Sequence, residues 1–298
     1  MFLPTMDVSV TPRTDTKPYN VQLNKSLLDI LGHIFEFKIS TAWHMDRFIA
    51  GKDQSKYFHL KLRRMWQAGL LESLQIYAGT RLGMPVYYML SKEGLNTLHE
   101  RAYYDKIRLK TYPTPNSFLS SGLFKHDAQI VELASLEAMN KSQNLNISFT
   151  GESGSMARED RSDKSIEVLT PDYTATYSLS DTKRIVYTEF ERTNKSISAM
   201  IRKLERYARY FDPEERKYAT IRLVFQTENM ETNFWLNIFL NKPSLLQHLD
   251  VLTTHVPLLQ LCQQFMKPVY ASEHGVKLKK EGRLCVEIAG RVKLLTYL

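Results

Sequence analysis

A segment rich in proline, serine and glycine separates two differently patterned parts of the chain. It covers residues 111–122, where the sequence TYPTPNSFLSSG has no helical periodicity, as is typical of connecting segments. The chain has 298 residues, a length that favours two domains, each long enough to bury its own core. We therefore expect a flexible leader at residues 1–22, one domain over residues 23–110, and a second domain over residues 123–298.

Composition and cysteine spacing exclude several classes of protein. Hydrophobic residues make up 43% of the chain and charged residues 24%, which is the balance of a globular protein. Cys262 and Cys285 belong to no C-x-x-C pair, so neither a zinc ribbon nor a disulfide scaffold is expected. The chain starts without a signal segment, and no apolar run approaches the roughly 20 residues of a membrane helix. We expect a cytoplasmic protein.

The N-terminal part carries a helical pattern followed by a hairpin pattern. Apolar residues recur with helical spacing in three segments, and two short extended segments follow, with turn residues between them. In order, the pattern predicts three helices, two strands and a final helix over residues 23–37, 40–50, 53–68, 70–78, 85–90 and 91–101. Trp43, Trp66, Tyr87 and Tyr88 fall on the apolar side of this pattern, so we expect them in the core.

This order of elements, together with the segments LRRMWQAGLL and YYMLSKEG, resembles the winged helix-turn-helix family over residues 23–101. In such modules the third helix enters the major groove of DNA, and the wing contacts phosphates or the minor groove. The resemblance implies that basic residues of the third helix and the wing tip contact DNA, namely Lys52, Lys56, His59, Arg63, Arg64 and Arg81. The alternative is that these are ordinary solvated charges and that the module binds another protein.

The charge distribution favours a nucleic-acid partner. Residues 20–110 contain 14 Lys and Arg against 8 Asp and Glu, so most of the net charge of +8 lies in the first third of the chain. A positive field of this kind attracts polyanions.

The second part alternates helical and extended patterns. The expected order is one helix, three strands, a helix, a strand and a further helix, over residues 126–140, 145–149, 167–179, 184–191, 196–211, 218–226 and 232–240. The first six of these elements follow the order of the PD-(D/E)xK nuclease-like core. We therefore expect an α+β protein with an N-terminal winged helix-turn-helix, followed by an α/β PD-(D/E)xK-like (restriction-endonuclease-like) domain.

Three carboxylates are expected to converge in this second domain. A hairpin with its turn at residues 180–183 would place Asp172 opposite Glu191, and Glu189 would share the same face because strands have a period of two. Carboxylates this close repel, and a divalent cation such as Mg²⁺ offsets that repulsion in phosphodiester chemistry. We predict Glu132, Asp172 and Glu189 as metal ligands. The alternative is a solvated strand face without catalytic function.

The segments Pro171-Asp172, EFERT at residues 189–193 and KLERY at residues 203–207 resemble the replication-relaxation family of plasmids and integrative elements, which joins a winged helix to a degenerate nuclease-like domain. The segments His126-Asp127 and FTGE at residues 149–152 are also similar to this family, and the resemblance covers about residues 23–227.

The acidic pair departs from the pattern of the family and of active nucleases. The family has Glu-x-Asp where this chain has Glu189-Phe-Glu191, and active enzymes of the fold have lysine at the position of Glu191. Lys203, on the next helix, could supply that charge. The predicted catalytic set is therefore Asp172, Glu189, Glu191 and Lys203, with enzymatic activity left open.

The resemblance implies a sequence-specific DNA-binding protein of a plasmid or integrative mobile element. Such a protein acts in replication, relaxation or mobilisation at an origin-like site on double-stranded DNA. The alternatives are a Mg²⁺-dependent DNA endonuclease or nickase, and a transcriptional repressor of a transfer operon. A relaxase or other mobilisation protein, and a second copy of the chain, are candidate partners. Residues 228–298 carry no functional pattern.

Overall fold

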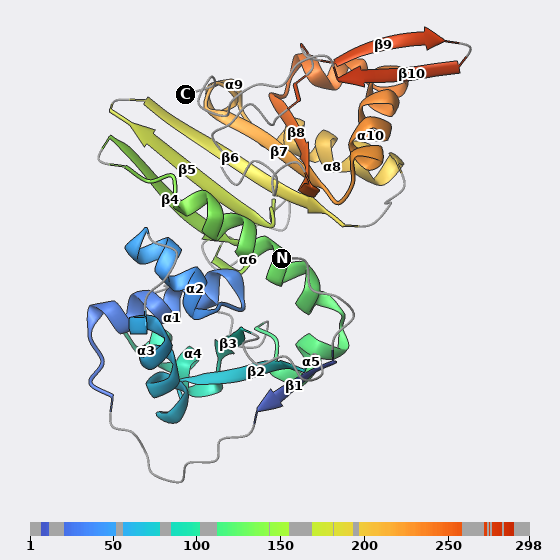
Figure 1. Cartoon of the computed structure of the whole chain (residues 1–298). Helices are drawn as coiled ribbons and strands as arrows, with labels where there is room; N and C mark the ends of the chain where they lie inside the picture. The colour runs from blue at the N-terminus through green and yellow to red at the C-terminus, as the bar shows by residue number, and fades with distance from the viewer. Residues whose placement is uncertain are drawn as a thin grey trace. The chain divides into compact units, whose positions relative to one another are not determined.

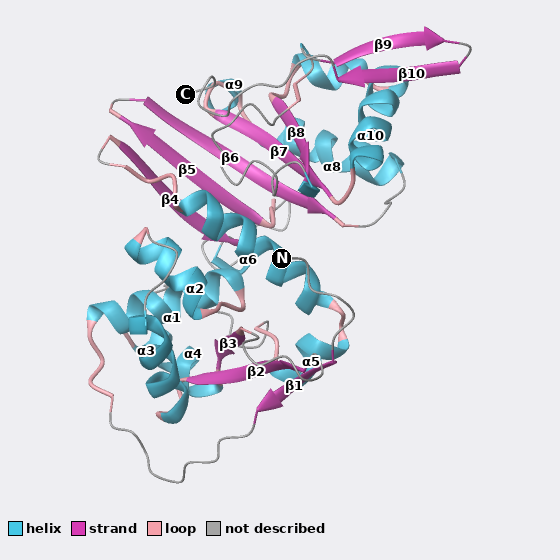
Figure 2. Cartoon of the chain, viewed as in Figure 1, coloured by secondary structure: helices cyan, strands magenta, loops and turns pink. Residues whose placement is uncertain are grey.

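The chain is a mixed α+β protein that divides into two compact units, shown in a computed structural model in Figures 1 and 2. Unit 1 comprises Met1–Met139 and Gly151–Glu159, and unit 2 comprises Asn140–Thr150 and Asp160–Leu298. The structure describes residues 7–11, 21–51, 56–77, 85–101, 112–142, 144–154, 169–180, 182–192, 197–257, 271–272, 274, 276–281 and 283–288. Among these residues, no helix combines the length and the apolar character needed to cross a membrane.

Unit 1 combines helices with a three-stranded antiparallel sheet. In chain order its elements are β1 (Asp7–Thr11), α1 (Lys25–Phe37), α2 (Ala42–Met45), the π-helical η1 (Asp46–Ala50), α3 (Lys56–Gln67), β2 (Leu71–Tyr77), β3 (Val86–Leu90), α4 (Lys92–Glu100), α5 (Pro115–Ser120) and α6 (Leu123–Ala138). The strand order is β1-β2-β3. All six elements expected over residues 23–101 are present at the positions that their periodicity predicted.

Side-chain caps explain where three of these helices begin. Asn24 accepts a hydrogen bond from the backbone N–H of Leu27 at the start of α1, and Thr41 forms a capping box with His44 at the start of α2. Ser91 caps α4 by accepting from the N–H of Gly94 at 3.0 Å. Each cap satisfies a backbone donor that has no partner within its own helix.

The segment expected to be a flexible leader contains a strand. Residues 7–11 form β1, which pairs antiparallel with β2 from Asp7 opposite Tyr77 to Thr11 opposite Ser73. The sequence DVSVT alternates with the period of a strand, but the prolines on either side of it favoured an irregular segment.

The core of unit 1 contains two of the four aromatic residues expected there, and a third is half-buried. Tyr87 and Tyr88 are buried, as predicted, and Trp66 is half-buried. Trp43 is 40% exposed, so the prediction that it lies in the core was wrong. It occupies the second position of a helix of only four residues, where a helical period identifies the inner face poorly.

The boundary between the two units does not lie at residues 111–122, where the sequence predicted it. Residues 115–120, within the predicted linker, form the helix α5, and α6 belongs to unit 1. Aromatic packing accounts for this, because Phe118 lies against Phe124 and Phe124 lies against Tyr87, with ring centroids 6.1 and 5.2 Å apart. Tyr112 is also buried and donates a hydrogen bond to the backbone oxygen of Lys38 at 2.7 Å.

A partly buried polar network attaches α6 to α2 and η1. The carboxylate of Glu132 accepts from Nη1 of Arg47 and lies next to Nε2 of His44, both at 2.9 Å. Nδ1 of His44 accepts from the backbone N–H of Thr41, so Nε2 carries the proton and donates to Glu132. Burial alone would raise the pKa of Glu132, but His44 and Arg47 outweigh it and lower that pKa to about 2.

Unit 2 contains a five-stranded mixed sheet in the order β4-β5-β6-β7-β8. These strands are β4 (Leu145–Gly151), β5 (Tyr173–Leu179), β6 (Thr182–Glu191), β7 (Ala219–Phe225) and β8 (Val251–His255). β5 pairs antiparallel with β6, whereas β6, β7 and β8 run parallel to one another. The other elements are α8 (Ile197–Tyr210), α9 (Pro213–Arg216), α10 (Glu228–Asn241), the 3-10 helix η3 (Pro243–Gln247), β9 (Val276–Glu281) and β10 (Arg283–Ile288).

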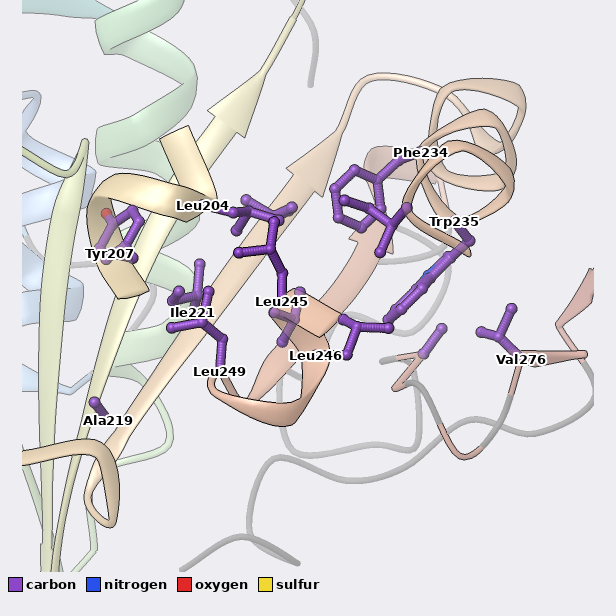
Figure 3. Packing of buried hydrophobic residues seen from close by; sticks show 14 of the residues in the cluster. Leu204, Tyr207, Ala219, Ile221, Phe234, Trp235, Leu245, Leu246, Leu249 and Val276 are labelled. Atoms are coloured by element: carbon purple, nitrogen blue, oxygen red, sulfur yellow. The ribbon is translucent and has the colours of Figure 1, made fainter. Parts of the chain in front are cut away.

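The core of unit 2 lies between β7 and the helices α8 and α10. Every residue of β7 is buried, as expected for a central strand of a sheet covered on both faces. Its alternate residues Ile221, Leu223 and Phe225 belong to one apolar cluster with side chains of α8 and α10, part of which Figure 3 shows. This packing fixes α8 over the sheet face that carries those residues.

The β5–β6 hairpin is tighter than expected. Leu179 pairs with Thr182 and Tyr173 with Thr188, which leaves only two residues in the turn. Ser180 has a φ of 52°, in the left-handed region that two-residue hairpin turns use. Asp172 therefore lies at the level of Glu189, and the predicted pairing with Glu191 was wrong by two residues.

The network around Glu132 predicts a specific loss of stability in acid. Its pKa in the folded chain lies below the usual value of 4.5, so its contribution is complete above about pH 4.5 and is lost as the pH falls towards 2. We expect Glu132→Gln to reduce the free energy of unfolding at pH 7 by about 1–2 kcal/mol, allowing for solvent screening of this partly exposed carboxylate. The variant should also show a weaker pH dependence between about pH 4.5 and 2.

Urea unfolding of both proteins from pH 7 to about pH 2.5 measures this difference. Glu100→Gln, at an exposed glutamate of α4, is the matched control and should follow the wild type. Parallel pH profiles for Glu132→Gln and the wild type would contradict the assignment.

Candidate functional site

The clearest polar site in unit 2 lies where β6 meets α8. Glu189 and Glu191 are two residues apart on β6 and therefore share one face of the sheet. Lys203 and Tyr207 are four residues apart on α8 and therefore share one face of the helix. Because α8 packs on the sheet face that carries the two glutamates, the four side chains meet.

The contacts within this site are short and specific. Nζ of Lys203 donates to Oε2 of Glu189 and to Oε1 of Glu191, both at 2.9 Å. The hydroxyl of Tyr207 donates to Oε1 of Glu189, also at 2.9 Å. The ammonium of Lys203 thus links two carboxylates that would otherwise repel each other, and Tyr207 fixes one of them.

Asp172 lies beside this cluster but has a structural contact of its own. Its Oδ2 accepts from the backbone N–H of Phe190 at 2.5 Å. Phe190 lies between Glu189 and Glu191 on β6, so this bond holds the residue that precedes β5 against the acidic pair. The structure therefore brings together Glu189, Glu191 and Lys203 of the predicted catalytic set, with Tyr207 as a fourth member, and ties Asp172 to the backbone between the two glutamates.

Burial determines the charges in the site. Glu189 and Glu191 are almost fully buried, and the side chain of Lys203 is 26% exposed. Burial alone would lower the pKa of Lys203, but the two carboxylates outweigh it and raise that pKa. Burial and the charge of Glu189 raise the pKa of Tyr207 well above its ordinary value. At neutral pH, Lys203 is therefore an ammonium and Tyr207 a neutral phenol, and neither can act as a base.

The predicted metal set of Glu132, Asp172 and Glu189 draws on both units, because Asp172 and Glu189 belong to unit 2. Glu132 belongs to unit 1, where His44 and Arg47 bind its two oxygens. Among the described residues, no group of three or more His, Cys, Asp or Glu side chains could hold a metal ion. The ammonium of Lys203 provides the positive charge that the prediction assigned to a divalent cation.

The predicted DNA-contacting residues are placed only in part. Lys52 and Arg81 lie outside the described residues, and Lys56 begins α3 without a described side chain. His59, Arg63 and Arg64 are exposed on α3, as the sequence predicted. No Asp or Glu occurs between Lys56 and Gln67, so the helix carries only positive side-chain charge.

A second polar cluster, in unit 1, was not predicted. Nζ of Lys38 contacts Oε2 of Glu152 at 2.5 Å and Oδ2 of Asp127 at 3.2 Å. The backbone N–H of Gly151 donates to Glu36 at 2.8 Å, and a Cβ at Gly151 would lie 2.0 Å from the backbone oxygen of Glu36. Gly151 is therefore required by close backbone packing. Asp127 and Glu152 lie in short segments that the sequence singled out, but nothing in the sequence indicated Lys38 as their partner.

A third polar group lies in the region that carried no sequence pattern. Nε1 of Trp235 donates to Oγ1 of Thr253 at 2.7 Å, and Thr253 contacts Oε1 of Glu231 at 2.6 Å. Because an indole nitrogen can only donate, the hydroxyl of Thr253 accepts from Trp235 and donates its own hydrogen bond to Glu231. The other oxygen of Glu231 lies 2.7 Å from Nδ1 of His255. This chain of contacts joins α10 to β8, and its residues are too far apart in the sequence to form a motif.

No protein-family model, curated protein or solved structure matches this chain. The functional conclusions therefore depend on the residues and geometry described above.

The site at β6 and α8 predicts how the chain responds to removal of the lysine charge. Lys203→Met leaves two buried carboxylates without the ammonium, and we expect the free energy of unfolding at pH 7 to fall by about 3 kcal/mol. Millimolar Mn²⁺ should restore part of this stability in the variant, because a divalent cation can take the place of the ammonium. The wild type should show no comparable Mn²⁺ effect.

Thermal and urea unfolding with and without Mn²⁺ provide the measurement. The control is Lys217→Met, because Lys217 forms an exposed pair with Glu214 and should have little effect. Wild-type stability in Lys203→Met, or an equal Mn²⁺ effect on both proteins, would show that the ammonium does not hold the two carboxylates.

Proposed function

We propose that the chain is a sequence-specific DNA-binding protein of a plasmid or integrative mobile element, acting at an origin-like site. In this proposal the elements from α1 to α4 form a winged helix-turn-helix. Unit 2 is a degenerate PD-(D/E)xK-like domain that serves as a binding or interaction scaffold. The observation that carries the proposal is the exposed basic face of α3.

The arrangement of α3 supports insertion into a major groove. Its inner side is formed by Phe58, Leu62 and Met65, which are 4%, 0% and 0% exposed. The outer side carries Arg63 and Arg64, and the helix has no acidic residue to oppose a phosphate backbone. Helices of this kind use basic side chains to fix the protein on DNA and a few further side chains to reach base edges.

The surrounding elements are consistent with this use of α3. Helix α2 and η1 precede it, the β2–β3 hairpin follows it, and α4 closes the module. In this arrangement the segment between β2 and β3 is the wing, which carries Arg81 and lies outside the described residues. A transcriptional repressor of a transfer operon would use the same DNA-binding surface, and a promoter–reporter assay separates that function from action at an origin.

The scaffold role of unit 2 is supported by the state of its acidic pair. Glu189 and Glu191 both bind the ammonium of Lys203, so the charge of the pair is already compensated within the fold. A protein with this arrangement can retain the nuclease-like fold without a metal-dependent reaction, because fold and chemistry are separable.

The DNA-binding proposal is tested by removing two exposed charges of α3. Arg63→Ala/Arg64→Ala should bind duplex DNA more weakly than the wild type, and its affinity should depend less on salt. Each lost phosphate contact lowers the slope of log affinity against log salt by about 1. Fluorescence anisotropy with origin-proximal and random duplexes, over about 50–200 mM salt, measures both effects.

The control is Lys92→Ala, because Lys92 is exposed on α4 in the same unit but outside α3. It should retain wild-type affinity and salt dependence. Weak wild-type binding that is insensitive to salt and equal on all duplexes would disprove the proposed function.

A metal-dependent DNA endonuclease or nickase is the second candidate. The observation in its favour is that Lys203 binds Glu189 and Glu191 near the end of β6, with Asp172 bound to the backbone between them. Under the scaffold proposal, wild type and Asp172→Ala should both leave supercoiled plasmid intact in Mg²⁺ or Mn²⁺. Nicking by the wild type that Asp172→Ala abolishes would establish the nuclease instead.

A further inference from the structure

The centre of the outer face of α3 is apolar. With about 3.6 residues per turn, the position opposite Phe58, Leu62 and Met65 is that of Leu60, and Arg63 and Arg64 lie on either side of it. Leu60 is 59% exposed. The side of the helix that faces solvent therefore presents a leucine between two arginines.

A second large side chain extends this apolar surface. Tyr57, one turn before Leu60, is 58% exposed, and these two are the most exposed of the large hydrophobic residues in the described part of the chain. Single exposed apolar residues are common on protein surfaces and need no explanation. This pair differs because it lies on α3. That helix has no acidic residue, and the proposed function places it in the major groove of DNA.

The neighbouring lysine holds Tyr57 in place. Nζ of Lys61 donates to the hydroxyl of Tyr57 at 3.0 Å and to Oγ of Ser26 at 2.7 Å. The ring of Tyr57 also lies edge-on to Phe58, with centroids 5.1 Å apart. Lys61 is thus directed towards Ser26, which belongs to α1. The exposed side chains of α3 then include Tyr57, Leu60, Arg63 and Arg64, together with His59.

The chemistry of this surface restricts what it can bind. Its positive charge is complementary to a polyanion, while Leu60 offers neither a hydrogen-bond donor nor an acceptor. In the major groove, the C5-methyl of thymine is the apolar group presented among the base edges. A leucine between phosphate-binding arginines therefore matches a duplex that carries thymine at the position it faces.

We propose that Leu60 is a specificity-determining residue that selects thymine through contact with its C5-methyl group, with Tyr57 packed beside it. This inference rests on the proposed DNA-binding function and deepens it, because it assigns base selection to an apolar side chain. Arg63 and Arg64 then contribute affinity and position the helix.

The experiment begins with selection of duplexes from a random pool by the wild-type chain. Each thymine of the selected sequence is then replaced by deoxyuridine, which removes only the methyl group. The wild type should lose affinity about fourfold at one or two of these positions, the effect of about one buried methyl group. Leu60→Ala should bind more weakly and should not distinguish thymine from uracil at those positions.

Two further variants make the test specific. Leu123→Ala removes another exposed leucine of unit 1, which is 46% exposed on α6, and should retain the thymine preference. Leu60→Gln places an amide that can pair with adenine, so its selected sequence should change at the same position. Circular dichroism spectra that match the wild type would confirm that the variants fold.

The possible outcomes separate this inference from the function on which it rests. If a sequence is selected but the wild type binds thymine and uracil equally, the role of Leu60 is disproved while DNA binding stands. Retention of the full preference in Leu60→Ala has the same consequence. If no duplex is enriched over the random pool, the DNA-binding proposal itself fails. If the surface around Leu60 binds an acidic protein instead of DNA, no duplex will be enriched.

Discussion

The ammonium of Lys203 lies 2.9 Å from each of two buried carboxylates, and the polar site of unit 2 depends on that contact. Without it, the side chains of Glu189 and Glu191 would lie next to each other on one buried face of β6 with no positive charge between them. The apolar cluster around β7 makes the contact possible, because it fixes α8 over the same face. Packing and electrostatics therefore support each other: the cluster positions the lysine, and the lysine donates a hydrogen bond to each of the two buried acids.

In unit 1, polar and aromatic contacts together determine which helices belong to the unit. Glu132 of α6 is bound by His44 and Arg47, and aromatic contacts run from Phe118 through Phe124 to Tyr87. These contacts place α5 and α6 with the N-terminal helices. A segment rich in proline and serine is therefore no guide to the boundary here, because buried aromatic residues within and beyond it pack on the preceding helices.

The acidic pair of unit 2 and the helix α3 of unit 1 differ in the exposure of their charged residues. In unit 2 the acidic pair and its lysine are largely buried and are satisfied by one another. In α3 of unit 1 the arginines are exposed and the leucine between them is exposed too. A buried, compensated cluster favours a structural role, whereas an exposed surface of positive and apolar groups is available to a ligand. This contrast is why the proposed function assigns recognition to α3 and a scaffold role to unit 2.

The sequence by itself determined the features that depend on local periodicity. These are the helices and strands over residues 23–101, the common face of Glu189 and Glu191, and the common face of Lys203 and Tyr207. The expectation that Asp172 lies beside the acidic pair held despite the error in the hairpin register, because its carboxylate accepts from the backbone N–H of Phe190, between the two glutamates. A strand such as β1 was missed because its pairing with β2 is not a local property.

Only the tertiary structure decided which of these faces meet. It placed Lys203 between the two carboxylates and bound Glu132 to His44 and Arg47. It also left Trp43 and Leu60 exposed. Contacts of this kind join residues far apart in the chain, and their energies depend on burial and geometry that no single segment contains. The period of a pattern fixes the direction of a side chain, but packing fixes its partner.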